Sequence, residues 1–291
     1  MGDDKVTGVD DAAQRAVLAE VAGRSAAQMG AENFPVALRV LPRRPRDLLA
    51  RVYGFARFVD DVGDEAPGDR AALLDLVDAD IRALAADRAT SVEPVTRLRP
   101  LLDAGVPAQP FLDLVEANRV DQRVGSYETF DDLIGYCMLS AAPVGRIVLY
   151  VAGAASAENV ADSDAVCNAL QVYEHCQDVG EDARSGRVYL PAADLRASGV
   201  DRDALQAPTT SAELRRVIGQ QVSRADALLE RGRPLVRRLS GWARLAVAGY
   251  VAGGVATSAA LRSADYEVLA RAVRPAKTRT AVAAVRLLMG R

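Results

Sequence analysis

Two short stretches of the sequence, "DDVGD" and "DVGED", lie far apart and nearly repeat one another. Each contains an Asp-x-x-x-Asp pair, Asp60 with Asp64 and Asp178 with Asp182. Residues four apart share one face of a helix, where like charges destabilise the helix unless something compensates for them. For either pair alone, a solvated helix face is the simpler interpretation.

Two such pairs together indicate a divalent cation. Apolar residues surround both stretches, so we expect the acids to point inward, where unpaired carboxylates are costly. Carboxylate oxygens without a cysteine or histidine cluster favour Mg²⁺ over zinc or iron. With Arg57 and Arg187 nearby, the pairs would form a site for a diphosphate bridged by metal ions. A carboxylate-bridged di-iron bundle needs two Glu-x-x-His motifs, whereas the chain's only histidine, His175, directly follows Glu174.

Helices must carry these residues, because helical periodicity recurs along almost the whole chain and alternating strand patterns are rare. The first Asp pair closes a helix expected at 46–64, and the second lies in one expected at 162–184. Further helices are predicted at 11–29, 69–87, 93–104, 108–121, 128–157, 210–239, 241–264 and from about 276. No Gly/Ser or Pro linker divides the chain, so we expect one all-α domain. Within it we distinguish a first segment and helix (1–30), a catalytic domain (31–275) and a basic tail (276–291).

Composition argues against several functional classes. The 291 residues are 50% apolar, which is enough for a sizeable core, and the net charge of −3 gives no electrostatic case for nucleic-acid binding. No nicotinamide fingerprint is found, and the three cysteines form no C-x-x-C pair. The acidic N-terminus lacks the apolar core of a signal peptide. We expect a cytoplasmic protein with a buried apolar helix over 245–261 and at most peripheral membrane contact.

Three motifs resemble the squalene/phytoene synthase family of head-to-head prenyl synthases, from about residue 31 to 270. They are "YGFARFVDDVGD", "YCMLSAAPVGRIVL" and "QDVGEDARSGRVYLP". The stretches "ENFPVALRVLP" and "EHCQDVGED" look most like the bacterial hydroxysqualene synthase branch of the hopanoid pathway. Members of that branch hydrate presqualene diphosphate instead of reducing it.

The resemblance implies an α-helical prenyl-synthase fold with a central cavity, and two or three Mg²⁺ ions bound with the diphosphate. Together with the two acidic motifs, the resemblance assigns metal binding to Asp60, Asp61, Asp64, Asp178 and Asp182. It assigns catalysis to Tyr53, Arg57, Tyr136, Gln171, Glu174, Arg187 and Tyr189. It assigns substrate binding to Phe34, Arg57, Arg187, Tyr250 and Arg271. Much of the wider family has Asn at Glu174 and Arg at Gln177, and these departures put the wider family's first-step chemistry in doubt.

The expected function is the Mg²⁺-dependent conversion of presqualene diphosphate to hydroxysqualene with release of diphosphate. One alternative is the head-to-head condensation of two prenyl diphosphates, as in a squalene or phytoene synthase. Another is a non-catalytic scaffold for a partner prenyl synthase. The expected partners are a prenyl diphosphate substrate, a membrane surface in transient contact and other squalene-pathway enzymes, with no nucleic acid.

Overall fold

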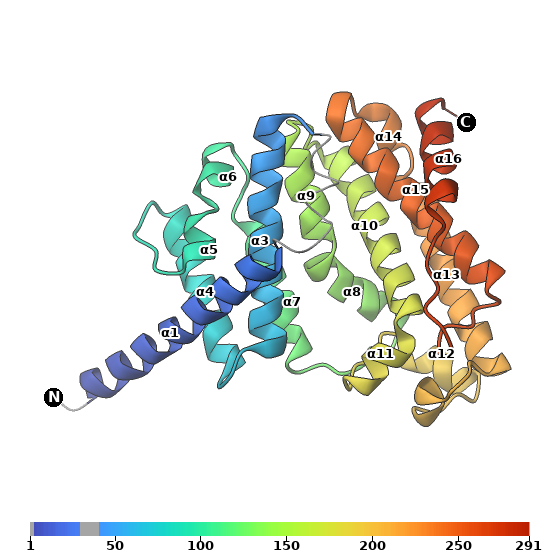
Figure 1. Ribbon diagram of the computed structural model, residues 1–291, viewed down its shortest axis with the longest axis horizontal. Helices are drawn as coiled ribbons and strands as arrows, with labels where there is room; N and C mark the ends of the chain where they lie inside the picture. The colour runs from blue at the N-terminus through green and yellow to red at the C-terminus, as the bar shows by residue number, and fades with distance from the viewer. Residues whose placement is uncertain (1–2, 30–40, 291) are drawn as a thin grey trace. The chain divides into compact units, whose positions relative to one another are not determined.

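A computed structural model describes residues 3–29 and 41–290, and throughout these ranges the regular structure is helical (Figure 1). A single isolated bridge, between Ser126 and Val188, is the one β-type pairing in the described ranges. The predicted all-α class is therefore confirmed. The chain divides into two compact units, Met1–Arg123 with Tyr150–Gly153, and Val124–Leu149 with Ala154–Arg291. This division differs from the three predicted segments, which stay predictions.

The first unit is built around α3, which contacts α1, α4, α5 and α7. On α3, Val52, Phe55, Val59 and Val62 recur every three or four residues and are buried, so they form one apolar face. The helix ends before Pro67, because the residue preceding a proline avoids the helical conformation. The helices of this unit are α1 (Asp3–Met29), α3 (Arg43–Glu65), α4 (Arg70–Ala85), α5 (Glu93–Thr96), α6 (Arg99–Asp103) and α7 (Gln109–Asp121).

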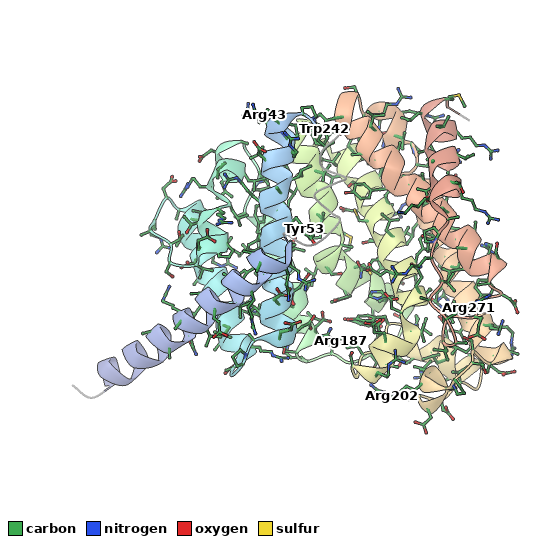
Figure 2. The ribbon with its side chains drawn as sticks, viewed as in Figure 1. Arg43, Tyr53, Arg187, Arg202, Trp242 and Arg271 are labelled. Atoms are coloured by element: carbon green, nitrogen blue, oxygen red, sulfur yellow. The ribbon has the colours of Figure 1, made fainter. Side chains whose placement is uncertain are left out.

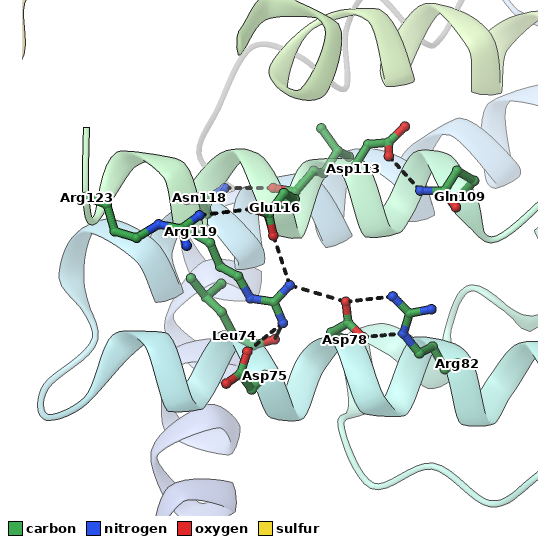
Figure 3. A network of polar contacts seen from close by, with 11 residues as sticks. Leu74, Asp75, Asp78, Arg82, Gln109, Asp113, Glu116, Asn118, Arg119 and Arg123 are labelled. Atoms are coloured by element: carbon green, nitrogen blue, oxygen red, sulfur yellow. Dashed lines mark hydrogen bonds and ion pairs between the residues drawn. The ribbon is translucent and has the colours of Figure 1, made fainter. Parts of the chain in front are cut away.

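Charged side chains connect α7 to α4 (Figure 3). Arg119 on α7 reaches Asp75 at 2.7 Å and Asp78 at 3.3 Å, both on α4. It also pairs with Glu116 one turn earlier, and Asp78 pairs with Arg82. This network fixes the rotation of α7 about its own axis. The residue before Arg119, Asn118, therefore faces α3 instead of α4.

The second unit is centred on α10, which packs along α13 and also contacts α8, α11, α14 and α15. The phenol of Tyr173 on α10 donates to Asp226 on α13, which also accepts from Arg262 on α15. The elements of this unit are α8 (Phe130–Ser140), α9 (Ala142–Val151), α10 (Ala157–Gln177), α11 (Val179–Arg184), α12 (Ala192–Ala197), a 3₁₀ turn η1 (Asp203–Gln206), α13 (Ala212–Gly232), α14 (Leu235–Arg238), α15 (Gly241–Ser263) and α16 (Lys277–Leu288).

Four predicted helices are interrupted in the structure. The one at 128–157 breaks at Ala141, just before Pro143, and the one at 210–239 breaks before Pro234, because proline lacks the N–H of a helical turn. The one at 93–104 divides into α5 and α6 close to Pro100. The one at 162–184 breaks at Asp178, whose backbone has φ −105° and ψ 16°. The last break changes the geometry of the second acidic motif.

Two helical stretches, Phe130–Val151 and Gly241–Ser263, are long and apolar enough to cross a membrane by length and composition alone. The first is the α8–α9 pair, broken at Ala141. The second is α15, half of which is buried against α10, α13, α14 and α16. The helix predicted over 245–261 is thus present and packed within its unit.

Candidate active site

The first acidic motif lies at the end of α3, and its three aspartates differ in their surroundings. Asp60 and Asp64 are exposed, whereas Asp61 is buried. Asp61 accepts from Ser25 Oγ at 2.5 Å and pairs with Arg57 Nε at 3.0 Å. The expected inward orientation therefore holds for Asp61 but not for the Asp60/Asp64 pair, which keeps its contact with solvent.

Arg57 lies one helical turn before Asp61 and is fixed from two sides. Besides Asp61, it donates from Nη2 to Gln28 Oε1 on α1 at 3.0 Å. The contacts that Asp61 makes are thus with the protein, and the metal role predicted for it stays a prediction. Tyr53, labelled on α3 in Figure 2, is half-buried one turn earlier.

Asp60 has an unusual electrostatic environment. Its side chain is exposed, yet the surrounding protein removes part of its hydration, and this raises its pKa to about 6. A hydrogen bond from Asn118 opposes the rise, while the charges of Asp64 and Asp61 add to it. A carboxylate in this position would gain from a nearby cation.

The second acidic motif spans the break between α10 and α11. Glu174 and Asp178 are exposed, and Asp182 is half-buried on α11. Burial raises the pKa of Asp182 to about 7, the charge of Asp178 adds to the rise, and Arg187 opposes it. Although Asp178 and Glu174 are exposed, partial loss of hydration beside the protein also raises their pKa values. These acidic side chains would therefore be stabilised by binding either a proton or a cation.

Each motif contains a glycine that permits close packing. A Cβ at Gly63 would lie 2.2 Å from Asn118 Oδ1 on α7. A Cβ at Gly180 would lie 3.0 Å from Leu269 Cδ2. Both "DVG" stretches therefore place a glycine where another segment of the chain approaches the helix, directly beside the acidic residues.

An aromatic cluster lies within the second unit. The rings of His175 and Tyr189 stack at 3.8 Å with 13° between their planes. Tyr136 lies 5.6 Å from Tyr189, and Tyr127 lies 5.4 Å from Tyr136. All four side chains are buried, and burial lowers the pKa of His175 to about 3, so its ring is neutral at physiological pH. The predicted Tyr136 and Tyr189 are thus brought together.

Sequence reasoning missed Tyr127 and gave His175 little weight. Tyr127 joins the cluster because Val188 N donates to Gly125 O at 2.8 Å, which places the two segments side by side. Nothing in the local sequence signals this pairing. His175 is not among the predicted site residues. Gln171, which is, approaches it with Nε2 at 3.4 Å from the Nε2 of His175 and so contacts the cluster.

The remaining predicted residues are more dispersed. Tyr250 is 47% exposed on α15. Figure 2 shows Arg187 just after α11 and Arg271 in the segment that follows α15. Arg271 is exposed, whereas the charge that acts on Asp178 belongs to Arg274, which sequence reasoning missed. Phe34 lies outside the described residues.

Gln177, where the wider family carries arginine, has a definite structural partner. Its Nε2 donates to the backbone carbonyl of Val273. The amide thus ties the end of α10 to the segment that leads into α16.

The donor set fits Mg²⁺ better than a transition metal. Within the described ranges, no group of three or more His, Cys, Asp or Glu side chains is spaced to hold a metal ion alone. Mg²⁺ retains several waters and usually takes one or two carboxylates together with substrate phosphates. The pairs Asp60/Asp64 and Asp178/Asp182, all exposed except the half-buried Asp182, meet that requirement.

The family model described as squalene/phytoene synthase matches residues 27–282. The chain belongs to this family. It is 38% identical over 221 residues to a hydroxysqualene synthase from Sinorhizobium fredii, with 74% of each chain covered. It is also 38% identical to a hydroxysqualene synthase from Rhodopseudomonas palustris, covering 72% of this chain and 71% of that one.

Solved structures agree on the fold. The squalene synthase HpnC from Alicyclobacillus acidocaldarius superposes with a TM-score of 0.75 at 40% identity, over 88% of this chain and 96% of that one. A dehydrosqualene synthase superposes with a TM-score of 0.80 at 21% identity, over 94% of this chain and 97% of that one. The chain therefore has the all-α isoprenoid synthase fold and is a prenyl diphosphate-using synthase.

Proposed function

We propose that this enzyme converts presqualene diphosphate to hydroxysqualene and releases diphosphate in a Mg²⁺-dependent reaction. The observation that carries the proposal is the two Asp-x-x-x-Asp motifs, each with at least one exposed aspartate, in a chain 38% identical to hydroxysqualene synthases. The motifs supply the oxygen ligands for a metal–diphosphate complex. The relatives indicate which of the family's reactions this complex would undergo.

The proposed first step is departure of the diphosphate. Each Asp-x-x-x-Asp pair would hold Mg²⁺, which when bound would supply charge neutralisation for the leaving group. Arg57 is suited to bind a phosphate oxygen because Asp61 and Gln28 already fix its guanidinium. Arg187 would contribute a second cation, consistent with its charge acting on Asp182.

The carbon–oxygen bond breaks with its electron pair leaving on the diphosphate, so a carbocation remains. The faces of Tyr136 and Tyr189 would stabilise it, because aromatic rings present negative charge density to a cation. The neutral ring of His175, stacked on Tyr189, adds no repelling charge. The cluster thus supplies a buried surface for a cationic intermediate.

Water then forms the new carbon–oxygen bond and loses one proton. We assign the proton acceptor to Glu174, which is exposed and whose pKa is raised by partial loss of hydration and by the charge of Asp178. An elevated pKa suits a carboxylate that must accept a proton near neutral pH. The asparagine of the wider family could not accept a proton in this way.

The alternative is head-to-head condensation, which is favoured by 32% identity to a phytoene synthase from Rhodobacter capsulatus over 88% of this chain. Incubating the enzyme separately with farnesyl diphosphate and with presqualene diphosphate, each with Mg²⁺, distinguishes the two. We expect an alcohol product only from presqualene diphosphate. Conversion of farnesyl diphosphate alone into a coupled hydrocarbon or a presqualene intermediate would contradict the proposal.

A scaffold role is tested by removing one ligand from each motif. Asp60→Ala combined with Asp178→Ala should abolish turnover if the chain is catalytic. Unchanged pathway output in cells carrying this variant would favour the scaffold instead.

Peripheral membrane contact is proposed through α16. Val282 and Val285 on this helix and Met289 directly after it are more than half exposed, and Arg279 and Arg286 flank them. Basic amphipathic helices of this kind bind anionic lipid surfaces. Sedimentation with anionic vesicles should be lost in Val282→Asp/Val285→Asp. Equal binding of the variant would contradict this role, and contact with other squalene-pathway enzymes stays a prediction.

A further inference from the structure

Asn118 on α7 is a buried polar residue in direct contact with the first acidic motif. Its Nδ2 donates to Asp60 Oδ1 at 3.1 Å and to the backbone carbonyl of Leu114 at 3.2 Å. Both partners are acceptors, so hydrogen-bond chemistry fixes which end of the amide faces Asp60. The contact leaves the second carboxylate oxygen of Asp60 available to another ligand.

Gly63 on α3 makes room for this amide. A Cβ at residue 63 would lie 2.2 Å from Asn118 Oδ1, too close for any real contact, and 3.0 Å from its Cγ, which is tight. The backbone at Gly63 is helical and has no positive φ. Space for Asn118, and not backbone conformation, is therefore what calls for glycine here.

A second amide secures the same junction. The carbonyl of Gly63 cannot receive the usual helical hydrogen bond, because residue 67 is a proline without an N–H. Gln122 Nε2 fills that position at 2.9 Å and also donates to Asn118 O at 3.2 Å. With Arg119 anchored on α4 (Figure 3), α7 presents Asn118 to Asp60 in one orientation.

We infer that Asn118 is a positioning residue for metal binding by Asp60, and that Gly63 is small in order to admit it. The inference rests on the proposed Mg²⁺ role of Asp60. A neutral donor suits this task, because it holds the carboxylate without cancelling the negative charge that attracts the cation. Lysine or arginine at residue 118 would compete with the metal for the same oxygens.

The test measures the dissociation constant of Mn²⁺ in the presence of inorganic pyrophosphate by electron paramagnetic resonance. Asn118→Ala should weaken Mn²⁺ binding about 10-fold or more, the usual cost of losing a residue that orients a metal ligand. Gly63→Ala should weaken it similarly by displacing Asn118. The double variant should be no weaker than Asn118→Ala, because both changes act through one contact. The double variant lacks the two Asn118 atoms nearest to the new Cβ, Oδ1 and Cγ, and keeps the Cβ of residue 118 at 3.2 Å.

Two controls separate the outcomes. Gln122→Ala removes a hydrogen bond between α7 and α3 but leaves the Asn118–Asp60 contact and the Arg119 ion pairs in place, so it should lower thermal stability and reduce Mn²⁺ affinity far less than Asn118→Ala. Asp60→Ala reports whether Asp60 binds metal at all. Wild-type affinity in Asn118→Ala, or an equal loss in Gln122→Ala, overturns the positioning role. Wild-type affinity in Asp60→Ala overturns the metal role of Asp60 and the inference with it.

Discussion

At the scale of single residues, the account depends on carboxylates that hold their protons unusually tightly. The pKa is raised to about 6 at Asp60 and to about 7 at Asp182, both mainly because the surrounding protein removes hydration. An acid whose pKa is raised in the folded state binds its proton more tightly there than in the unfolded chain. Each of these carboxyl groups therefore stabilises the fold at pH values below its ordinary pKa of 3.8. The contribution is lost as the pH rises through the raised pKa, about 6 for Asp60 and about 7 for Asp182. A bound cation would reverse that loss.

Metal binding should therefore depend on pH. Protons compete with Mg²⁺ for these oxygens, so the affinity for Mg²⁺, measured without pyrophosphate because that anion also takes up protons, should rise between about pH 5 and about pH 8. The increase in melting temperature caused by Mg²⁺ should be larger at the higher pH. Calorimetric titration and thermal unfolding at both pH values measure this, and a pH-independent affinity would contradict it.

Glu174 allows a second residue-scale prediction. Glu174→Gln keeps the size of the side chain but cannot accept a proton, so hydroxysqualene formation should fall about 100-fold, as for loss of a general base. Mn²⁺ binding should change little, since the motif's Asp pairs remain. Product analysis by gas chromatography gives the rate, and Glu174→Asp should restore part of it. Full activity in Glu174→Gln would exclude this assignment.

At the scale of elements, close helix contacts keep the second unit together. A Cβ at Gly232, at the end of α13, would lie 2.5 Å from the backbone oxygen of Asp162 on α10. Backbone cannot move aside as a side-chain tip can, so helix α13 itself would have to shift. Gly249 on α15 has no heavy atom within 4 Å of the equivalent position.

These two glycines give a matched pair of variants. Gly232→Ala should lower the free energy of unfolding by about 1–3 kcal/mol, the usual cost of overpacking. Gly249→Ala should raise it by about 0.5–1 kcal/mol, because alanine favours the helix. Urea denaturation of both proteins measures the difference. Equal effects in the two variants would mean that the α10–α13 contact is not tight.

The sequence predicts most helices because their apolar periodicity is local information. The breaks at Ala141 and before Pro234 follow from proline chemistry, so they too could be anticipated. The break at Asp178 could not, since no proline or positive-φ residue marks it. Tyr127, Asn118 and Arg274 escaped prediction because tertiary contacts bring them to the motifs from distant elements.

At the scale of the whole molecule, the chain combines a family fold with a departure at the second motif. The squalene/phytoene synthase model spans residues 27–282, so the architecture is shared with condensing enzymes. What distinguishes the proposed reaction is the fate of the carbocation. We assign water capture to Glu174 and stabilisation of the carbocation to the neutral aromatic cluster around His175.

The most direct test follows the oxygen atom. The purified enzyme is incubated with presqualene diphosphate and Mg²⁺ in oxygen-18-labelled water, and the products are analysed by mass spectrometry. We predict hydroxysqualene that carries one labelled oxygen, together with one released diphosphate. An unlabelled alcohol, a hydrocarbon product, or no consumption of presqualene diphosphate would contradict the proposed hydration.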